Sequence, residues 1–318
     1  MKRRYLALYY ASDVHGSERC WRKFLGAPRF YGASKLVMGG DLTGKAIVPI
    51  VLGADGAFAC SFLGEDRSGT GDEGRAELEA AIRFNGMYPW AASAEEVGAV
   101  ADDEQAQAEL FDRLLRNEAR RWVELADTRL RDQDVDGFVM AGNDDPWFVD
   151  DVLASGAVLR FCDDQIVRVG DHEMLSLSYA NRTPWDSPRE LDEDVLYERV
   201  DRLAQQLDDP KTAIFNLHVP PFDSGLDLVV ALDDQLQPVF RSGTPVRVPA
   251  GSTAVREIIE RYQPAASLHG HIHESKGAAR LGRTLSLNSG SEYNSGRLHG
   301  VLVRFAEGEA HSHQFVVG

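Results

Sequence analysis

The sequence contains only three cysteines in 318 residues, Cys20, Cys60 and Cys162, and they lie far apart. An odd and scattered set provides neither a disulfide framework nor the paired spacing of a zinc-binding cysteine site. This pattern is typical of a protein that folds in a reducing compartment, and we therefore expect a cytoplasmic location.

The sequence also lacks an apolar run of the roughly 18 residues that a membrane-spanning helix needs. Residues 1–4 are mostly basic and precede the apolar residues 5–11, as in a secretory signal, but the apolar part is too short and no cleavage site follows. We interpret residues 5–11 as a first buried strand and expect no membrane partner.

Basic residues are scarce relative to acidic ones. The 34 Lys and Arg residues face 50 Asp and Glu residues, which gives a net charge of −16. Proteins that bind nucleic acid rely on clusters of Lys and Arg, and no long basic run is present. We therefore expect a small substrate rather than nucleic acid, while the sequence leaves the oligomeric state open.

Patterns typical of strands and helices alternate along the chain, which predicts an α/β fold. We expect one domain over residues 1–318, with an insertion at about 46–131 that either covers the site or packs to one side. Within it, residues 47–52 and 57–62 flank Asp55-Gly56, a favoured hairpin turn. A Gly- and acid-rich stretch follows at 64–74, and an apolar stripe broken only by Glu118 predicts a helix over 103–131.

Several helix boundaries carry capping patterns. Ser17 predicts a helix start, with a stop at Gly26. Ser187-Pro188-Arg189-Glu190 has the form of a capping box that opens a helix to about Leu207. Ser252 predicts another helix start, and residues 300–305 and 312–317 read as closing strands.

Five apolar, strand-like runs end at residues that can bind a metal ion. Because open α/β sheets carry their chemistry at the carboxyl ends of strands, these ends should converge. The runs are residues 5–12, 36–40, 138–142, 213–217 and 265–270, followed respectively by Asp13 with His15, Asp41, Asn143 with Asp144, His218, and His271 with His273.

Seven of these side chains are suitable ligands, more than one ion needs. Asp13 and His15 are two apart, so in an extended segment both point the same way, and His271 and His273 repeat that spacing. The set predicts two divalent ions about 4 Å apart that share a carboxylate. Mixed nitrogen and oxygen ligands suit Mn, Fe, Zn, Co or Ni, with the identity left open.

The blocks Asp13-x-His15, Gly40-Asp41, Gly142-Asn143, His218 and Gly270-His271-x-His273 resemble, in this order, the calcineurin-like metallophosphoesterase superfamily, in particular an uncharacterised bacterial branch. The resemblance spans residues 13–273 apart from the insertion. It implies an α/β/β/α sandwich of two mixed sheets flanked by helices. It also implies one ion on Asp13, His15, Asp41 and His273, and a second on Asp41, Asn143, His218 and His271.

A centre of this kind would hydrolyse phosphoesters. Two divalent cations against two carboxylates leave positive charge that lowers the pKa of bound water. A hydroxide that bridges the two metals would then attack phosphorus in line. We assign catalytic roles to Asn143, His218 and Asp144.

Asp144 stands where the family usually has a histidine that protonates the leaving group. A carboxyl beside two cations should be ionised, so it cannot donate a proton. It would also repel a phosphomonoester dianion more than a phosphodiester monoanion, and we therefore expect a preference for small phosphodiesters or activated leaving groups. A phosphomonoesterase or nucleotidase on the same centre is an alternative. A non-catalytic scaffold of this fold is less favoured, because every ligand position holds a competent residue.

Other candidates have two interpretations each. Lys45 contacts phosphate or is simply solvated, and the second reading is favoured. Arg182, Trp185 and Asp186 line the substrate pocket or belong to a plain loop. His269 lies behind the metal ligands or in the core, whereas His311 and His313 are expected to be exposed strand residues.

Overall fold

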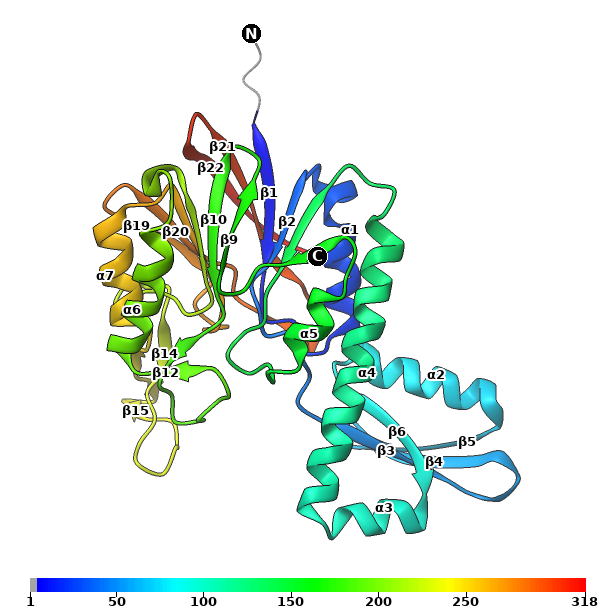
Figure 1. Cartoon of the computed structure of the whole chain (residues 1–318). Coiled ribbons are helices and arrows are strands. Elements are labelled where there is room, and N and C mark those ends of the chain that lie inside the picture. The colour runs from blue at the N-terminus through cyan, green and yellow to red at the C-terminus, as the bar shows by residue number, and fades with distance from the viewer. Residues whose placement is uncertain (1–4) are drawn as a thin grey trace.

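The computed structural model describes residues 5–318. Residues 1–4, considered as the start of a secretory signal, lie outside the described residues. Two six-stranded sheets pack face to face (Figure 1). In the first, the order is β22-β21-β1-β2-β7-β8, and in the second β19-β20-β18-β13-β10-β9. Each sheet contains parallel and antiparallel pairs, so the predicted α/β sandwich of two mixed sheets flanked by helices is confirmed.

The strands that carry the candidate ligands agree with the sequence prediction to within two or three residues. They are β1 (Leu6–Ala11), β2 (Lys35–Met38), β7 (Asp136–Val139), β13 (Ile214–Leu217) and β18 (Ala266–His269). The other sandwich strands are β8 (Leu159–Phe161), β9 (Gln165–Val169), β10 (His172–Leu177), β19 (Gly277–Leu281), β20 (Thr284–Asn288), β21 (His299–Ala306) and β22 (Glu309–Val317).

Alternate residues of β1 enter two different parts of the core. Leu8 and Tyr10 lie between the two sheets, with Val37, Phe138 and Ile214. Tyr9 and Ala11 lie on the other face, under the helices. Because both faces are buried, the strand reads as a continuous apolar run rather than an alternating one.

Helices cover the outer face of each sheet. Helices α1 (Glu18–Tyr31), α4 (Glu104–Leu130) and α5 (Val149–Ala154) pack on the first sheet, and α6 (Glu193–Ala204) and α7 (Thr253–Tyr262) pack on the second. The predicted caps Ser17 and Ser252 are confirmed, since each Oγ accepts a backbone N–H three residues on.

Two predicted helix boundaries are wrong. Helix α1 continues through Gly26 and ends at Tyr31, followed by Gly32, whose φ of 67° suits a left-handed cap. The Ser187 capping box opens no helix; Glu190 instead begins the short strand β12 (Glu190–Leu191), paired with β11 (Ala180–Asn181). The Ser187 hydroxyl instead donates to Asp144 Oδ1 at 2.9 Å.

The insertion forms a small sheet of its own, with the order β5-β4-β3-β6. The predicted hairpin joins β3 (Ile47–Leu52) to β4 (Ala57–Phe62). The sequence did not predict β5 (Glu65–Thr70) or β6 (Tyr88–Ser93). It indicated helices after residue 74 but gave bounds for none before 103, and the structure has α2 (Gly71–Phe84) and α3 (Ala94–Ala101) in this part. This sheet projects from the carboxyl edge of the sandwich, and α4 runs along both (Figure 1). No helix within residues 5–318 is long and apolar enough to cross a membrane.

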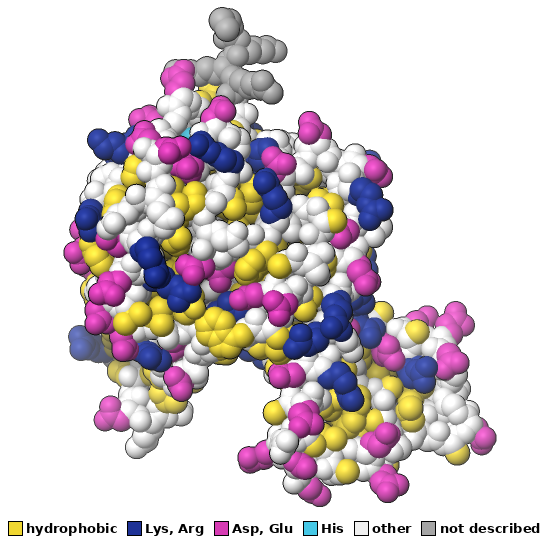
Figure 2. Space-filling view, in the orientation of Figure 1, with side chains coloured by type: hydrophobic (Ala, Val, Ile, Leu, Met, Phe, Trp, Pro, Cys, Tyr) yellow, Lys and Arg dark blue, Asp and Glu magenta, His cyan; other side chains and the backbone are white. Residues whose placement is uncertain are grey.

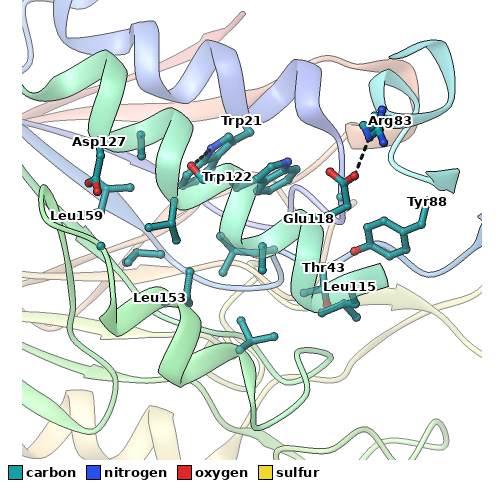
Figure 3. Close-up of a pocket in the computed structure, with 18 of the residues that line it drawn as sticks. Trp21, Thr43, Arg83, Tyr88, Leu115, Glu118, Trp122, Asp127, Leu153 and Leu159 are labelled. Carbon is teal, nitrogen blue, oxygen red and sulfur yellow. Dashed lines mark hydrogen bonds and ion pairs between the residues drawn. The ribbon is translucent and has the colours of Figure 1, made fainter. Parts of the chain in front are cut away.

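Helix α4 joins the insertion to the sandwich through the predicted apolar stripe. Figure 3 shows Leu115 and Trp122 facing the core, where Trp21 Nε1 donates to the Trp122 carbonyl at 3.1 Å and the two indole rings stack. A gap of about 30 Å³ remains among these side chains. Glu118, the polar break in the stripe, accepts a hydrogen bond of 2.6 Å from Arg83 of α2.

Candidate metal centre

The candidate ligands follow the carboxyl ends of β1, β2, β7, β13 and β18, which meet at the lower edge of the sandwich in Figure 1. Strands β1, β2 and β7 are parallel in one sheet, and β13 and β18 are parallel in the other. Figure 2 shows that this edge is hollowed beside the projecting insertion. Residues as far as 258 positions apart in sequence, such as His15 and His273, are therefore brought to one place.

Five of the seven predicted ligands form groups whose donor atoms lie within 4.8 Å of one another. One group is Asp13, His15 and His273, and another is Asp13, Asp41 and His218. In the first, the Nε2 atoms of His15 and His273 are 3.1 Å apart. In the second, His218 Nε2 lies 3.4 Å from Asp41 Oδ2. A third group contains His15, Asp41 and Asp144.

Asn143 and His271 contact each other at the border of these groups. His271 Nδ1 lies 2.7 Å from Asn143 Oδ1, and the backbone N–H of His271 donates to Asp13 Oδ1 at 3.0 Å. The His271 ring is 5.5 Å from the ring of His218, centroid to centroid. All seven predicted ligands thus lie in one cluster, while their division between two ions and the bridging role of Asp41 remain predictions.

The orientation of His218 suits a ligand. Its Nδ1 lies 2.8 Å from the carbonyl oxygen of Gly39, which can only accept, so Nδ1 carries a proton. Its Nε2 is buried and has no hydrogen-bond partner among the described residues. A histidine held through one ring nitrogen, with the other aimed at carboxylates, is the usual arrangement of a metal ligand.

The backbone at the cluster is unusual. Asp13, His15, Asp41 and His271 have φ angles of 57°, 37°, 52° and 64°, in the left-handed region that non-glycine residues rarely adopt. Such conformations concentrate at functional sites, where the surrounding structure enforces them.

Two glycines in the motif blocks are required by close approach. A Cβ at Gly142 would lie 2.1 Å from Asp41 Oδ1, and one at Gly270 would lie 2.2 Å from Asp13 Oδ2. Both glycines therefore make room for a neighbouring strand's carboxylate.

Burial and mutual charge set the protonation of the cluster. Burial alone lowers the pKa of His218, but the carboxylates of Asp41 and Asp13 raise it to about 10. Burial favours the neutral form of Asp13, yet hydrogen bonding and charge from His273 hold its pKa well below the ordinary value. Burial lowers the pKa of both His15 and His271 to about 3. The positive charge of protonated His218 thus offsets the negative charge of the Asp13 and Asp41 carboxylates. A divalent cation could neutralise the same carboxylates instead.

The residues present fit divalent metal ions. They supply buried carboxylates, imidazoles and an amide oxygen, and Nε2 of His218 makes no hydrogen bond to any of residues 5–318. This donor set suits Mn, Fe, Zn, Co or Ni.

Lys45 and Asp144 form an ion pair beside the cluster. The Asp144 carboxylate also accepts from Ser187 Oγ at 2.9 Å and from Asn143 Nδ2 at 3.1 Å, and its own N–H donates to Asp41 Oδ1 at 3.0 Å. Burial opposes ionisation of Asp144, but the bond to Lys45 lowers its pKa overall. The prediction of a simply solvated Lys45 is therefore wrong, although 57% of its side chain remains exposed.

Sequence reasoning did not single out several residues that hold this site together. Buried Asp145 accepts backbone N–H bonds from Leu42, Thr43 and Gly142, which ties the loop after β2 to the loop after β7. The ring of Tyr293 lies 4.7 Å from that of His15. Only Asp145 had a sequence signal, namely its position in the motif block.

The outlying histidines lie where the sequence predicted. His269 is buried, with Nδ1 2.8 Å from the Leu217 carbonyl oxygen, outside the ligand groups. His311 and His313 are exposed on β22.

Comparisons with known proteins place the fold. No family model matches the chain. An uncharacterized protein of Methanocaldococcus jannaschii, MJ1162, is 25% identical over 128 residues, or 40% of this chain, and the match spans about half (51%) of that relative's length.

Among solved structures, TT1561 of Thermus thermophilus matches with a TM-score of 0.55 and 11% identity, over 98% of this chain and 99% of that one. YfcE, a phosphoesterase from E. coli, matches with a TM-score of 0.32 and 12% identity, over 97% and 98% of the two chains. At such identities the TT1561 match supports the shared fold alone.

Proposed function

We propose that this protein is a metal-dependent phosphoester hydrolase of the calcineurin-like metallophosphoesterase superfamily. The observation that carries the proposal is the cluster of Asp13, His15, Asp41, His218 and His273 at the carboxyl edge of two sheets. The order of the motif blocks along the chain supports the same conclusion. The strained backbone at four of the predicted ligands indicates a site shaped for function.

The proposed site holds two divalent ions. Asp13, His15, Asp41 and His273 would hold one, and Asp41, Asn143, His218 and His271 the other. When bound, the ions would supply a bridging hydroxide for in-line attack and positive charge for the phosphoryl oxygens. The protein keeps His218 oriented through Gly39 and keeps Asp41 and Asp13 in place through the space left at Gly142 and Gly270.

We further propose that the enzyme favours small phosphodiesters. Asp144 is surrounded by donors, namely Lys45, Ser187 and the Asn143 amide, so its carboxylate has no proton to give to a leaving group. Substrates whose leaving group needs no strong acid are therefore preferred. Lys45 offsets part of the negative charge of Asp144. The remaining charge repels a phosphomonoester dianion more than a phosphodiester monoanion, which favours diesters.

The test compares bis(p-nitrophenyl) phosphate with p-nitrophenyl phosphate after loading with Mn²⁺. We expect faster turnover of the diester, loss of turnover in His218→Ala, and retained turnover in His172→Ala. His172 is a matched control, because it is also buried with Nδ1 against a carbonyl oxygen, that of Thr212, but lies at the start of β10.

Asp144→His tests the preference itself and should raise monoester turnover relative to diester turnover. A monoester preference in the wild type would favour a phosphomonoesterase or nucleotidase on the same centre. Absence of turnover with either substrate, despite bound metal, would support a non-catalytic scaffold.

A further inference from the structure

We propose that a pocket beside the metal centre is a subsite for an aromatic group of the substrate, such as a nucleobase. This inference rests on the proposed function, since the subsite would hold one arm of a phosphoester. The pocket has a volume of about 320 Å³, within the range of small-molecule sites. The motif blocks that resemble the superfamily do not include this pocket, because part of its wall comes from the insertion.

The inner end of the pocket is polar and reaches the candidate metal centre. Lys45, Asp144 and Ser187 line it, and Asp144 is also a member of the group with His15 and Asp41. A phosphate at the centre would therefore have one ester arm directed along this pocket.

The outer walls present flat apolar surfaces. Phe111 and Leu115 come from α4, and Trp185, Pro188 and Pro146 come from the opposite loops. Trp185 is 65% exposed, and within residues 5–318 no aromatic ring stacks on it. An exposed indole beside the polar end of the pocket is suited to stack on a planar ring of a ligand.

The backbone that carries Trp185 and the ring of Phe111 are held by contacts within the protein. Glu190 is buried and accepts from the backbone N–H groups of Thr183 and Ser187, which brace the loop that carries Trp185 from both sides. Phe111 packs edge-on against Tyr88, whose hydroxyl accepts from the N–H of Gly44 at 2.5 Å, next to Lys45. Such preorganisation reduces the entropy that binding would cost.

The test compares adenosine 5′-monophosphate with ribose 5-phosphate, which differ only by the base. Saturation-transfer NMR and competition titrations in EDTA avoid turnover. We expect the base protons to receive the strongest saturation and the nucleotide to bind about tenfold more tightly than ribose 5-phosphate. Phe111→Ala and Trp185→Ala should remove most of this difference, whereas Trp185→Phe should retain it.

Phe30→Ala serves as the control, since Phe30 is 81% exposed near the end of α1 and outside the pocket. Equal affinity for the two ligands, or an undiminished difference in both alanine variants, would overturn the subsite. Base-dependent binding without hydrolysis by the Mn²⁺-loaded protein would uphold the subsite and refute the proposed function. Hydrolysis without base-dependent binding would support the proposed function and refute the subsite.

Discussion

Replacing Arg189 with methionine should destabilise the protein strongly, because Arg189 is a completely buried cation. Its guanidinium makes two bonds to Asp150, of 2.7 and 3.0 Å, and lies 3.3 Å from Asp163. Without Arg189, Asp163 keeps its bonds to Ser178 but loses its counter-charge. Breaking a buried pair on one side costs about 3–5 kcal/mol.

The size of the effect can be expressed as a melting temperature. The entropy of unfolding is about 0.7 kcal/mol/K for a chain of this length, so Tm should fall by about 4–7 °C. Arg199→Met is the matched control. Arg199 also pairs with an aspartate, Asp164, at 2.7 Å and lies over Tyr179, but at the surface, where such pairs contribute about 0–1 kcal/mol.

The loss should depend on pH in one direction. Burial raises the pKa of Asp163 to about 6, against the opposing bonds from Ser178 and charge of Arg189. Because this pKa is above the value in the unfolded chain, the contribution of Asp163 to stability is greatest at low pH and is lost as pH rises through about 6. Removal of Arg189 raises this pKa further, so the drop in Tm should be larger at pH 8 than at pH 5.

Thermal melts of metal-free protein at pH 5, 6, 7 and 8 would measure this. A drop no larger than that of Arg199→Met, or the same at pH 5 and pH 8, would refute the reasoning.

Three further predictions concern other residues. In Gly270→Ala, a Cβ 2.2 Å from Asp13 Oδ2 should displace that carboxylate and lower the Mn²⁺ content measured by mass spectrometry. The control Gly26→Ala, where a Cβ would have no atom within 4 Å, should keep the metal and stabilise α1 by about 0.5–1 kcal/mol. An unchanged Mn²⁺ content in Gly270→Ala would contradict this prediction. Tyr88→Phe leaves the Gly44 N–H without its acceptor, so the free energy of unfolding measured in urea should fall by about 1–3 kcal/mol. A fall below roughly 0.5 kcal/mol would show that this hydrogen bond contributes little to stability. Burial raises the pKa of Cys162 to about 12, so a thiol reagent should label Cys162 only on unfolding; labelling of the native protein within seconds would refute its burial.

The sequence allowed the sandwich and its ligand-bearing edge to be predicted because each ligand lies within four residues of the end of a buried strand. Strand β5 escaped prediction because its residues are polar and most are exposed, so no alternation marks it. It forms through its register with β4, which is a tertiary property.

The Ser187 region was mispredicted for a similar reason. The local pattern favoured a capping box, but the Ser187 hydroxyl donates to Asp144. The Arg189 guanidinium is buried and pairs with Asp150 and Asp163. Those partners lie 26 or more positions away, and no local pattern could reveal them. The ion pair of Lys45 with Asp144 could not be predicted for the same reason, since the two lie 99 positions apart.

The division of the seven candidate ligands between the two sheets, four on one and three on the other, has a kinetic consequence. Asp13, His15, Asp41 and Asn143 follow strands of the first sheet, whereas His218, His271 and His273 follow strands of the second. Ions held by both sets would link the two sheets across the open edge of the sandwich. The sheets could then not separate without releasing the ions. Metal loading would then lengthen the lifetime of the native state against unfolding and proteolysis, beyond any role in catalysis.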